Sequence, residues 1–153
     1  MHKKSSYLYV TLSGIGLSGT LLWLLGKRNP KSIIRSTLRH SDYETLTPYV
    51  IAQAQLESAN FTSDLFKRSN NMFGMKNATS RNQLGHISAM PGDDYRVYDS
   101  PRQSIEDFLL YLYAVGFPNS VESSFDYANS LKARDYYGIS SQEYTVGLNS
   151  WLA

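Results

Sequence analysis

The stretch AQAQLESANFTSDLFKRSNNMFGMK, residues 52–76, decides the fold and carries one carboxylate, Glu57, at the end of a predicted helix. Thr47 suits the N-cap of this helix and Pro48 its first turn, and the apolar run up to Leu56 favours a buried helix. Apolar surroundings disfavour the charged form of a carboxyl group, so we expect the pKa of Glu57 to be raised. A carboxyl group that keeps its proton near neutral pH can act as a general acid.

The same stretch holds a series of residue types in a distinctive order: Glu57-Ser58, Ser63, Leu65, Asn70-Asn71, Phe73-Gly74 and Lys76. This order resembles the glucosaminidase domain of glycoside hydrolase family 73, whose members cleave bacterial peptidoglycan. Met72 and Met75 stand where that family has Leu and Ile, and both are conservative exchanges of apolar volume. The resemblance runs from about Thr47 to the C-terminus and is clear again at residues 95–100.

The resemblance implies a mainly α (α+β) fold, a lysozyme-like helical domain with a small β-hairpin lobe. It also implies an endo-β-N-acetylglucosaminidase that cleaves the β-1,4 bond after N-acetylglucosamine, with Glu57 as the general acid. Asn70, Asn71 and Phe73 are then expected to bind substrate at the sugar cleft. Taken alone, these three residues are explained equally by the end of a helix and a core aromatic side chain.

Residues 77–100 are polar and rich in turn formers, which predicts a β-hairpin. In the family such a hairpin forms one wall of the cleft, where Tyr95 is expected to bind substrate. No glutamate occurs between Glu57 and Glu106, so Asp94, with Asp93 beside it, is the candidate for the second catalytic group. A solvated turn explains both aspartates as well. Alternatively, the acetamido group of the substrate supplies the second function, and we favour that route.

The family also has a tyrosine close to the cleavage point in its C-terminal region. Three residues of this chain could match it, Tyr136, Tyr137 and Tyr144. We expect Tyr137 to contact the reacting sugar or its acetamido group, and Tyr136 and Tyr144 to bind substrate. A half-buried aromatic core explains the tyrosines as well.

Two later helices have clear start signals. Ser100-Pro101 predicts a helix with an apolar face that reaches Val115, and Ser140 with Glu143 forms a capping-box pattern. Glu106 and Asp107 fall near the start of the first of these helices. We expect them to interact with the helix dipole.

The N-terminal part has a different character. Residues 7–25 contain no charged residue and are long enough for a membrane-spanning helix. This predicts an anchor at 1–25, a basic stem at 26–40 and the glucosaminidase-like domain at 41–153. The protein would then be a single-pass membrane protein of a bacterial cell envelope or of a membrane-containing phage virion, in contact with the lipid bilayer through residues 7–25.

Charge is distributed unevenly along the chain. Residues 1–40 carry seven basic and no acidic residues, whereas residues 41–153 carry eight basic and thirteen acidic residues. The basic residues after the apolar segment outnumber those before it, and the positive-inside rule would keep the domain in the cytoplasm, away from peptidoglycan. An exception to the rule, a domain that crosses at lysis, or a viral membrane would resolve this conflict.

Other chemistries have little support. The chain has no cysteine and three scattered histidines, so we expect no metal and no cofactor. The acidic domain argues against nucleic acid as a partner. Two alternatives to the glucosaminidase stay open. One is a muramidase or lytic transglycosylase on the same fold, and the other is a non-catalytic protein that binds peptidoglycan or forms part of a virion.

Overall fold

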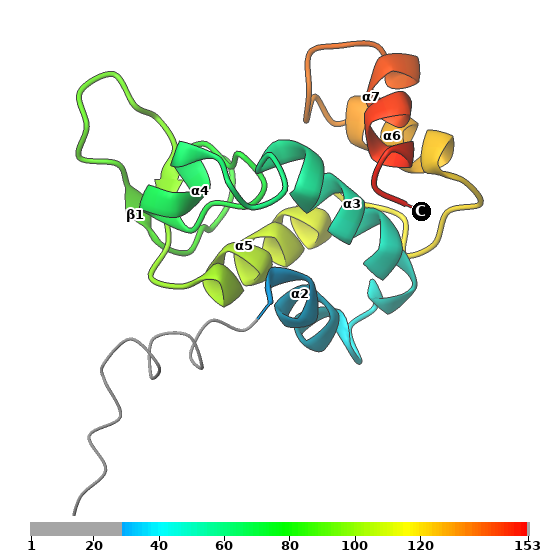
Figure 1. The fold of residues 1–153 in the computed structure, drawn as a ribbon, viewed down its shortest axis with the longest axis horizontal. Helices are drawn as coiled ribbons and strands as arrows, with labels where there is room; N and C mark the ends of the chain where they lie inside the picture. Colours follow the sequence, from blue (N-terminus) through cyan, green and yellow to red (C-terminus); the bar gives the residue numbers. More distant parts are fainter. Residues whose placement is uncertain (1–28, 153) are drawn as a thin grey trace, which may run out of the picture.

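The computed structural model describes residues 29–152, which form a helical body with a small sheet at one end (Figure 1). Helices α3 (Thr47–Glu57) and α5 (Pro101–Ala114) occupy the middle of the molecule. On one side lie α4 (Asp64–Ser69) and the hairpin, and on the other the pair α6 (Ser124–Lys132) and α7 (Ser141–Asn149). The predicted mainly helical fold with a two-stranded lobe is confirmed.

Local signals explain where these helices begin. The Ser100 side chain caps α5 by accepting a hydrogen bond from the Gln103 amide at 3.2 Å, and Pro101 occupies the first turn. The capping box predicted at Ser140 and Glu143 is present at the start of α7. Helix α3 begins at Thr47 itself, one residue earlier than expected, directly after the short 3-10 helix η1 (Glu44–Leu46).

Helix α2 (Pro30–Leu38) falls within the segment that we had expected to be a stem. Its apolar face packs against both α3 and α5, and Ile34 and Leu38 are completely buried. The exposed face carries Arg35, and Arg39 follows the end of the helix. Residues 30–38 are therefore packed into the helical body, because the apolar face of this helix is buried against α3 and α5.

The lobe contains the predicted hairpin, with antiparallel strands β1 (His86–Ile87) and β2 (Arg96–Val97). His86 pairs with Val97 and Ile87 with Arg96. The strands are only two residues long, so backbone pairing alone would hold the lobe weakly.

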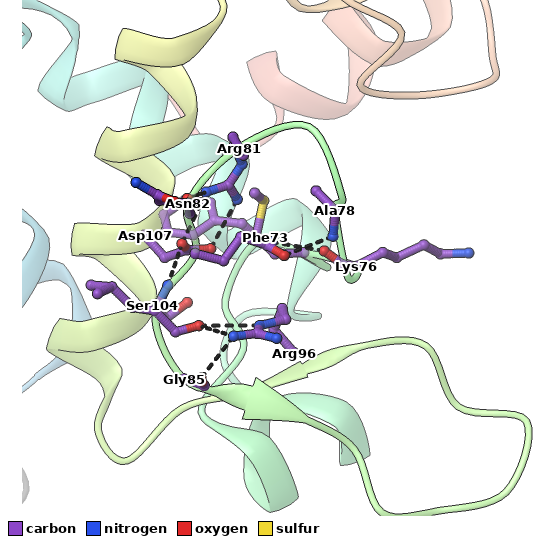
Figure 2. Close-up of polar contacts among 12 residues, drawn as sticks. Phe73, Lys76, Ala78, Arg81, Asn82, Gly85, Arg96, Ser104 and Asp107 are labelled. Carbon is purple, nitrogen blue, oxygen red and sulfur yellow. Dashed lines mark hydrogen bonds and ion pairs between the residues drawn. The ribbon is translucent and has the colours of Figure 1, made fainter.

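A buried polar network joins the lobe to α5. Asp107 is 0% exposed, and its two carboxylate oxygens accept hydrogen bonds from the Arg81 guanidinium at 3.0 Å each, as Figure 2 shows. The same carboxylate accepts from the Tyr98 hydroxyl at 2.8 Å and from the Leu84 amide at 2.9 Å. The Arg96 side chain donates to the carbonyls of Leu84 and Gly85. Asp107 is therefore an internal anchor for residues 81–84, and the dipole role expected for it was wrong.

The structure contradicts the predicted location in a membrane. No helix among residues 29–152 is long and apolar enough to cross a bilayer. The anchor expected at 1–25, with its apolar segment 7–25, lies outside the described residues.

Candidate active site

Glu57 is the last residue of α3, as predicted, and its side chain is half-buried. The six residues before Leu56, from Val50 to Gln55, are all buried, so the helix delivers the carboxyl group from inside the core. Burial raises the pKa of Glu57, and a hydrogen bond from the Tyr144 hydroxyl to Oε1, at 2.7 Å, opposes part of that rise. The arrangement favours a carboxylic acid that holds its proton.

The second carboxyl oxygen of Glu57 faces the backbone at Gly74. A Cβ atom at position 74 would lie 3.7 Å from Oε2, and the φ angle there is +61°, a conformation that favours glycine. The Tyr136 hydroxyl donates a hydrogen bond to the carbonyl of Phe73, the residue before Gly74. Residues 73–74 are therefore held close to the Glu57 carboxyl group, and Gly74 has no side chain that would cover this group.

A left-handed turn follows the acid directly. Ala59, Asn60 and Phe61 have φ angles of 49°, 54° and 64°, although none of them is glycine. The buried Ser58 side chain supports the turn: its hydroxyl donates to the Ala54 carbonyl and accepts from the Phe61 amide at 2.9 Å. Consecutive left-handed residues are strained, and such strain often occurs beside functional groups.

Of the three candidate tyrosines, the structure brings Tyr144 to the Glu57 carboxylate. Its ring lies flat against that of Tyr137, with centroids 3.9 Å apart and planes 4° apart. The Tyr137 hydroxyl donates to the Ala128 carbonyl at 2.8 Å, on α6. Tyr137, which we expected to contact the reacting sugar, therefore supports the ring of Tyr144, while Tyr136 holds the Phe73 carbonyl.

The profile of the glucosaminidase family, described as mannosyl-glycoprotein endo-beta-N-acetylglucosaminidase, matches residues 38–152. The chain belongs to this family. No curated protein matches it. Among solved structures, it is similar to a type VI secretion system effector-immunity complex from Pseudomonas protegens, with 15% identity and a TM-score of 0.57. The match covers 85% of this chain and 98% of that chain, and at this identity it concerns the fold.

Three residues expected to bind sugar have internal partners in this glucosaminidase domain. Asn70 ends α4 in the left-handed conformation and donates to the Tyr98 carbonyl at 2.8 Å. The amide of Asn71 is buried and bonds to backbone groups of Met75 and Arg96. Phe73 is 1% exposed and stacks on the ring of Phe108, 4.2 Å away between centroids. These side chains shape the turn beside Glu57 from inside the fold.

The acids of the hairpin are paired with cations. Arg68 binds Asp93 at 2.6 Å. A hydrogen bond from the Tyr95 amide, and then the contact with Arg68, lowers the pKa of Asp93. Asp94 is exposed and lies 3.4 Å from the Lys76 ammonium group, which also sits over the ring of Tyr95. The contacts of both aspartates are thus within the lobe. Within residues 29–152, no three potential metal ligands gather in one place.

Residues that the sequence analysis did not single out complete the surroundings of the acid. Gln53 and Tyr127 are fully buried, and the Tyr127 hydroxyl donates to the Gln53 Oε1 atom at 2.6 Å. Gln53 precedes Glu57 by four positions, so a helical reading places both side chains on one face of α3. That spacing was the available signal for Gln53; nothing local in the sequence points to Tyr127.

Proposed function

We propose that this glucosaminidase domain hydrolyses peptidoglycan at the β-1,4 bond after N-acetylglucosamine, with Glu57 as the general acid. The observation that carries the proposal is the state of Glu57, a half-buried carboxyl group with a raised pKa and, among residues 29–152, one side-chain hydrogen-bond donor, Tyr144. A carboxyl group that keeps its proton to higher pH suits the departing glycosidic oxygen, which needs a proton donor. The family match supports this reaction class.

The second catalytic function is assigned to the substrate. Asp93 and Asp94 have cationic partners in Arg68 and Lys76, which favours a route that needs no second carboxylate. Glu57 donates its proton to the glycosidic oxygen while the acetamido carbonyl oxygen attacks the anomeric carbon, and the bond to the leaving sugar breaks. Water then attacks the anomeric carbon, the cyclic intermediate opens, and the Glu57 carboxylate accepts a proton from that water.

A single acid also fits a lytic transglycosylase, in which a hydroxyl of the substrate replaces water and closes a 1,6-anhydro ring. The pairing of both hairpin aspartates is the observation that keeps this second candidate open. The two reactions leave different ends on the glycan, so the products distinguish them.

The test is mass spectrometry of fragments released from purified peptidoglycan by the full chain, by Glu57→Gln and by Glu122→Gln. Glu122 is an exposed glutamate and serves as the matched control. We expect reducing-end N-acetylglucosamine from the wild type and from Glu122→Gln, and none from a folded Glu57→Gln variant.

Other outcomes would replace the proposal. Anhydro ends would establish the transglycosylase, and reducing-end N-acetylmuramic acid a muramidase. A folded chain that binds the wall and releases nothing would establish a binding or structural role.

A further inference from the structure

We propose that Gln53 is a positioning residue for Glu57, because its buried amide ties α6 to α3 and so holds the surroundings of the carboxyl group. The inference deepens the proposed function and rests on Glu57 as the general acid. Gln53 itself is 0% exposed, so it acts only through its neighbours.

The oxygen atom of the Gln53 amide makes a hydrogen bond to α6. The Tyr127 hydroxyl donates to Oε1 of Gln53 at 2.6 Å, and Tyr127 is completely buried. This bond joins residues 74 positions apart and crosses from α6 to the middle of α3. Because α6 and α7 pack closely on each other, a tie between α6 and α3 also fixes α7, which carries Tyr144.

The Nε2 atom of the amide meets no acceptor among the described residues. A buried amide that is not fully satisfied has a free-energy cost, so an energetic reason is needed for its presence in the core. The hydrogen bond that Oε1 accepts from Tyr127, which joins two helices, supplies that reason.

One oxygen of Glu57 depends on this tie. Tyr144, on the helix pair that Gln53 holds, donates to Oε1. Gln53 therefore sits one helical turn before the acid and is connected, through Tyr127, α6 and α7, to the hydrogen-bond donor of its carboxyl group.

The groups that face Glu57 are tyrosines. Burial, and to a smaller extent the charge of Glu57, raises the pKa of Tyr144 on α7, of Tyr136 in the loop between α6 and α7, and of Tyr127 on α6. The charged groups on α2 and η1, Arg35, Arg39 and Glu44, border a groove with Thr47 at the opposite end of α3. No ion pair to Glu57 occurs within residues 29–152, so the protonation of Glu57 depends mainly on how far water is kept from it.

The experiment is a carbon-13 NMR titration of the Glu57 carboxyl group in the full chain, for the wild type, Gln53→Met and Gln55→Met. Gln55 is the matched control: it lies on the same helix, is 2% exposed and also has an unpaired amide atom, but its Nε2 bonds to Asn60. We expect both variants to melt at lower temperature, and only Gln53→Met to lower the pKa of Glu57. Water admitted to the carboxyl group lowers this pKa, and because burial is the larger effect, this change outweighs the rise that a weakened Tyr144 hydrogen bond causes.

Tyr127→Phe provides a second route if Gln53→Met does not fold, because it removes the same tie from the α6 side. It should lower the pKa of Glu57 in the same direction, and a double variant should add little to either single one. In assays, kcat should fall while KM changes less than about twofold. An unchanged pKa in Gln53→Met or Tyr127→Phe, or an equal shift in Gln55→Met, would overturn the inference. The titration reads Glu57 directly, so a chain without cleavage activity would overturn the proposed function and still decide the role of Gln53.

Discussion

At Glu57, burial and the Tyr144 hydrogen bond act on the proton in opposite directions. Burial is the larger effect and raises the pKa, while the hydroxyl stabilises the carboxylate and lowers it. A general acid works in its protonated form, so activity should fall as the pH rises through the pKa of Glu57. The pH above which activity falls, the alkaline limit, thus depends on two opposing effects on the pKa of Glu57: burial and the Tyr144 hydrogen bond.

Tyr144→Phe should move that limit to higher pH. The variant removes the donor that stabilises the carboxylate, so the pKa of Glu57 rises further and the acid stays protonated over a wider range. The rate at the optimum should fall by about tenfold, because the carboxyl group is no longer held in one orientation. The measurement is kcat/KM as a function of pH. Tyr137→Phe, in the same ring stack, is the control and should leave the limit in place.

Asp94→Asn should retain cleavage within about tenfold of the wild type if the acetamido group provides the second function. The aspartate is exposed and paired with Lys76, and an asparagine keeps its size. Rates on purified peptidoglycan give the answer. A loss comparable to that in Glu57→Gln would instead identify Asp94 as the base of an inverting enzyme.

At the scale of elements, the turn after Glu57 is strained, because three consecutive residues that are not glycine have positive φ angles. Ala59 is exposed and has a φ angle of 49°, so Ala59→Gly should stabilise the protein by about 0.5–1 kcal/mol, as expected for glycine in a left-handed position. Thermal unfolding should show a rise of roughly 2–4 °C. The control is Ala133→Gly, an exposed alanine with a φ angle of −61°, where glycine should lower the stability. Equal effects of both changes would show that the turn is not strained.

The lobe depends on its buried ion pair. The side chains of Arg81 and Asp107 are 8% and 0% exposed, so Arg81→Met leaves a buried carboxylate without its cation and should cost about 3–5 kcal/mol. Hydrogen exchange should then be fastest in residues 77–85, which Asp107 and Arg96 otherwise hold. Lys67→Met removes a cation from an exposed pair with Asp64 and should leave the melting temperature nearly unchanged. Unchanged exchange in the lobe of Arg81→Met would contradict this assignment.

Helices with local start or end signals could be predicted from the sequence, but the tertiary contacts between elements could not. Ser100 and Ser140 mark helix starts because a cap needs only neighbouring residues, and the position of Glu57 at a helix end follows from the apolar run before it. Which tyrosine bonds to Glu57, Tyr144 and not Tyr137, depends on how α7 packs, and no local pattern contains that information. The burial of Asp107 likewise required the loop at 81–84 to be placed.

At the scale of the whole molecule, α2 adds to the helical body a segment that lies mostly before the family match. The family match begins at residue 38, after most of this helix, yet Ile34 and Leu38 are fully buried between α3 and α5. The sequence predicted only a basic stem at these positions, because the surfaces that cover the apolar face of α2 come from residues 47 and beyond.

Removal of α2 should therefore unfold the domain. Each large apolar side chain lost from a core costs about 2–5 kcal/mol, and the net stability of a domain is only about 5–15 kcal/mol. A chain starting at Asn29 should unfold cooperatively in circular dichroism, whereas one starting at Ser41 should show no cooperative transition. Equal melting temperatures for the two would contradict the role of α2.

The hydrogen bond between Tyr144 and Glu57 joins residues 87 positions apart, and this separation has a consequence for the newly made chain. Ribosomes add about 5–20 residues per second, so roughly 4–17 seconds pass between the synthesis of the acid and that of its partner. During this interval α3 exists without α7, and the carboxyl group has neither its donor nor its apolar cover. The hydrogen bond that we propose to orient the general acid can thus form only after α7 has been made, and the order of synthesis delays the assembly of the candidate site.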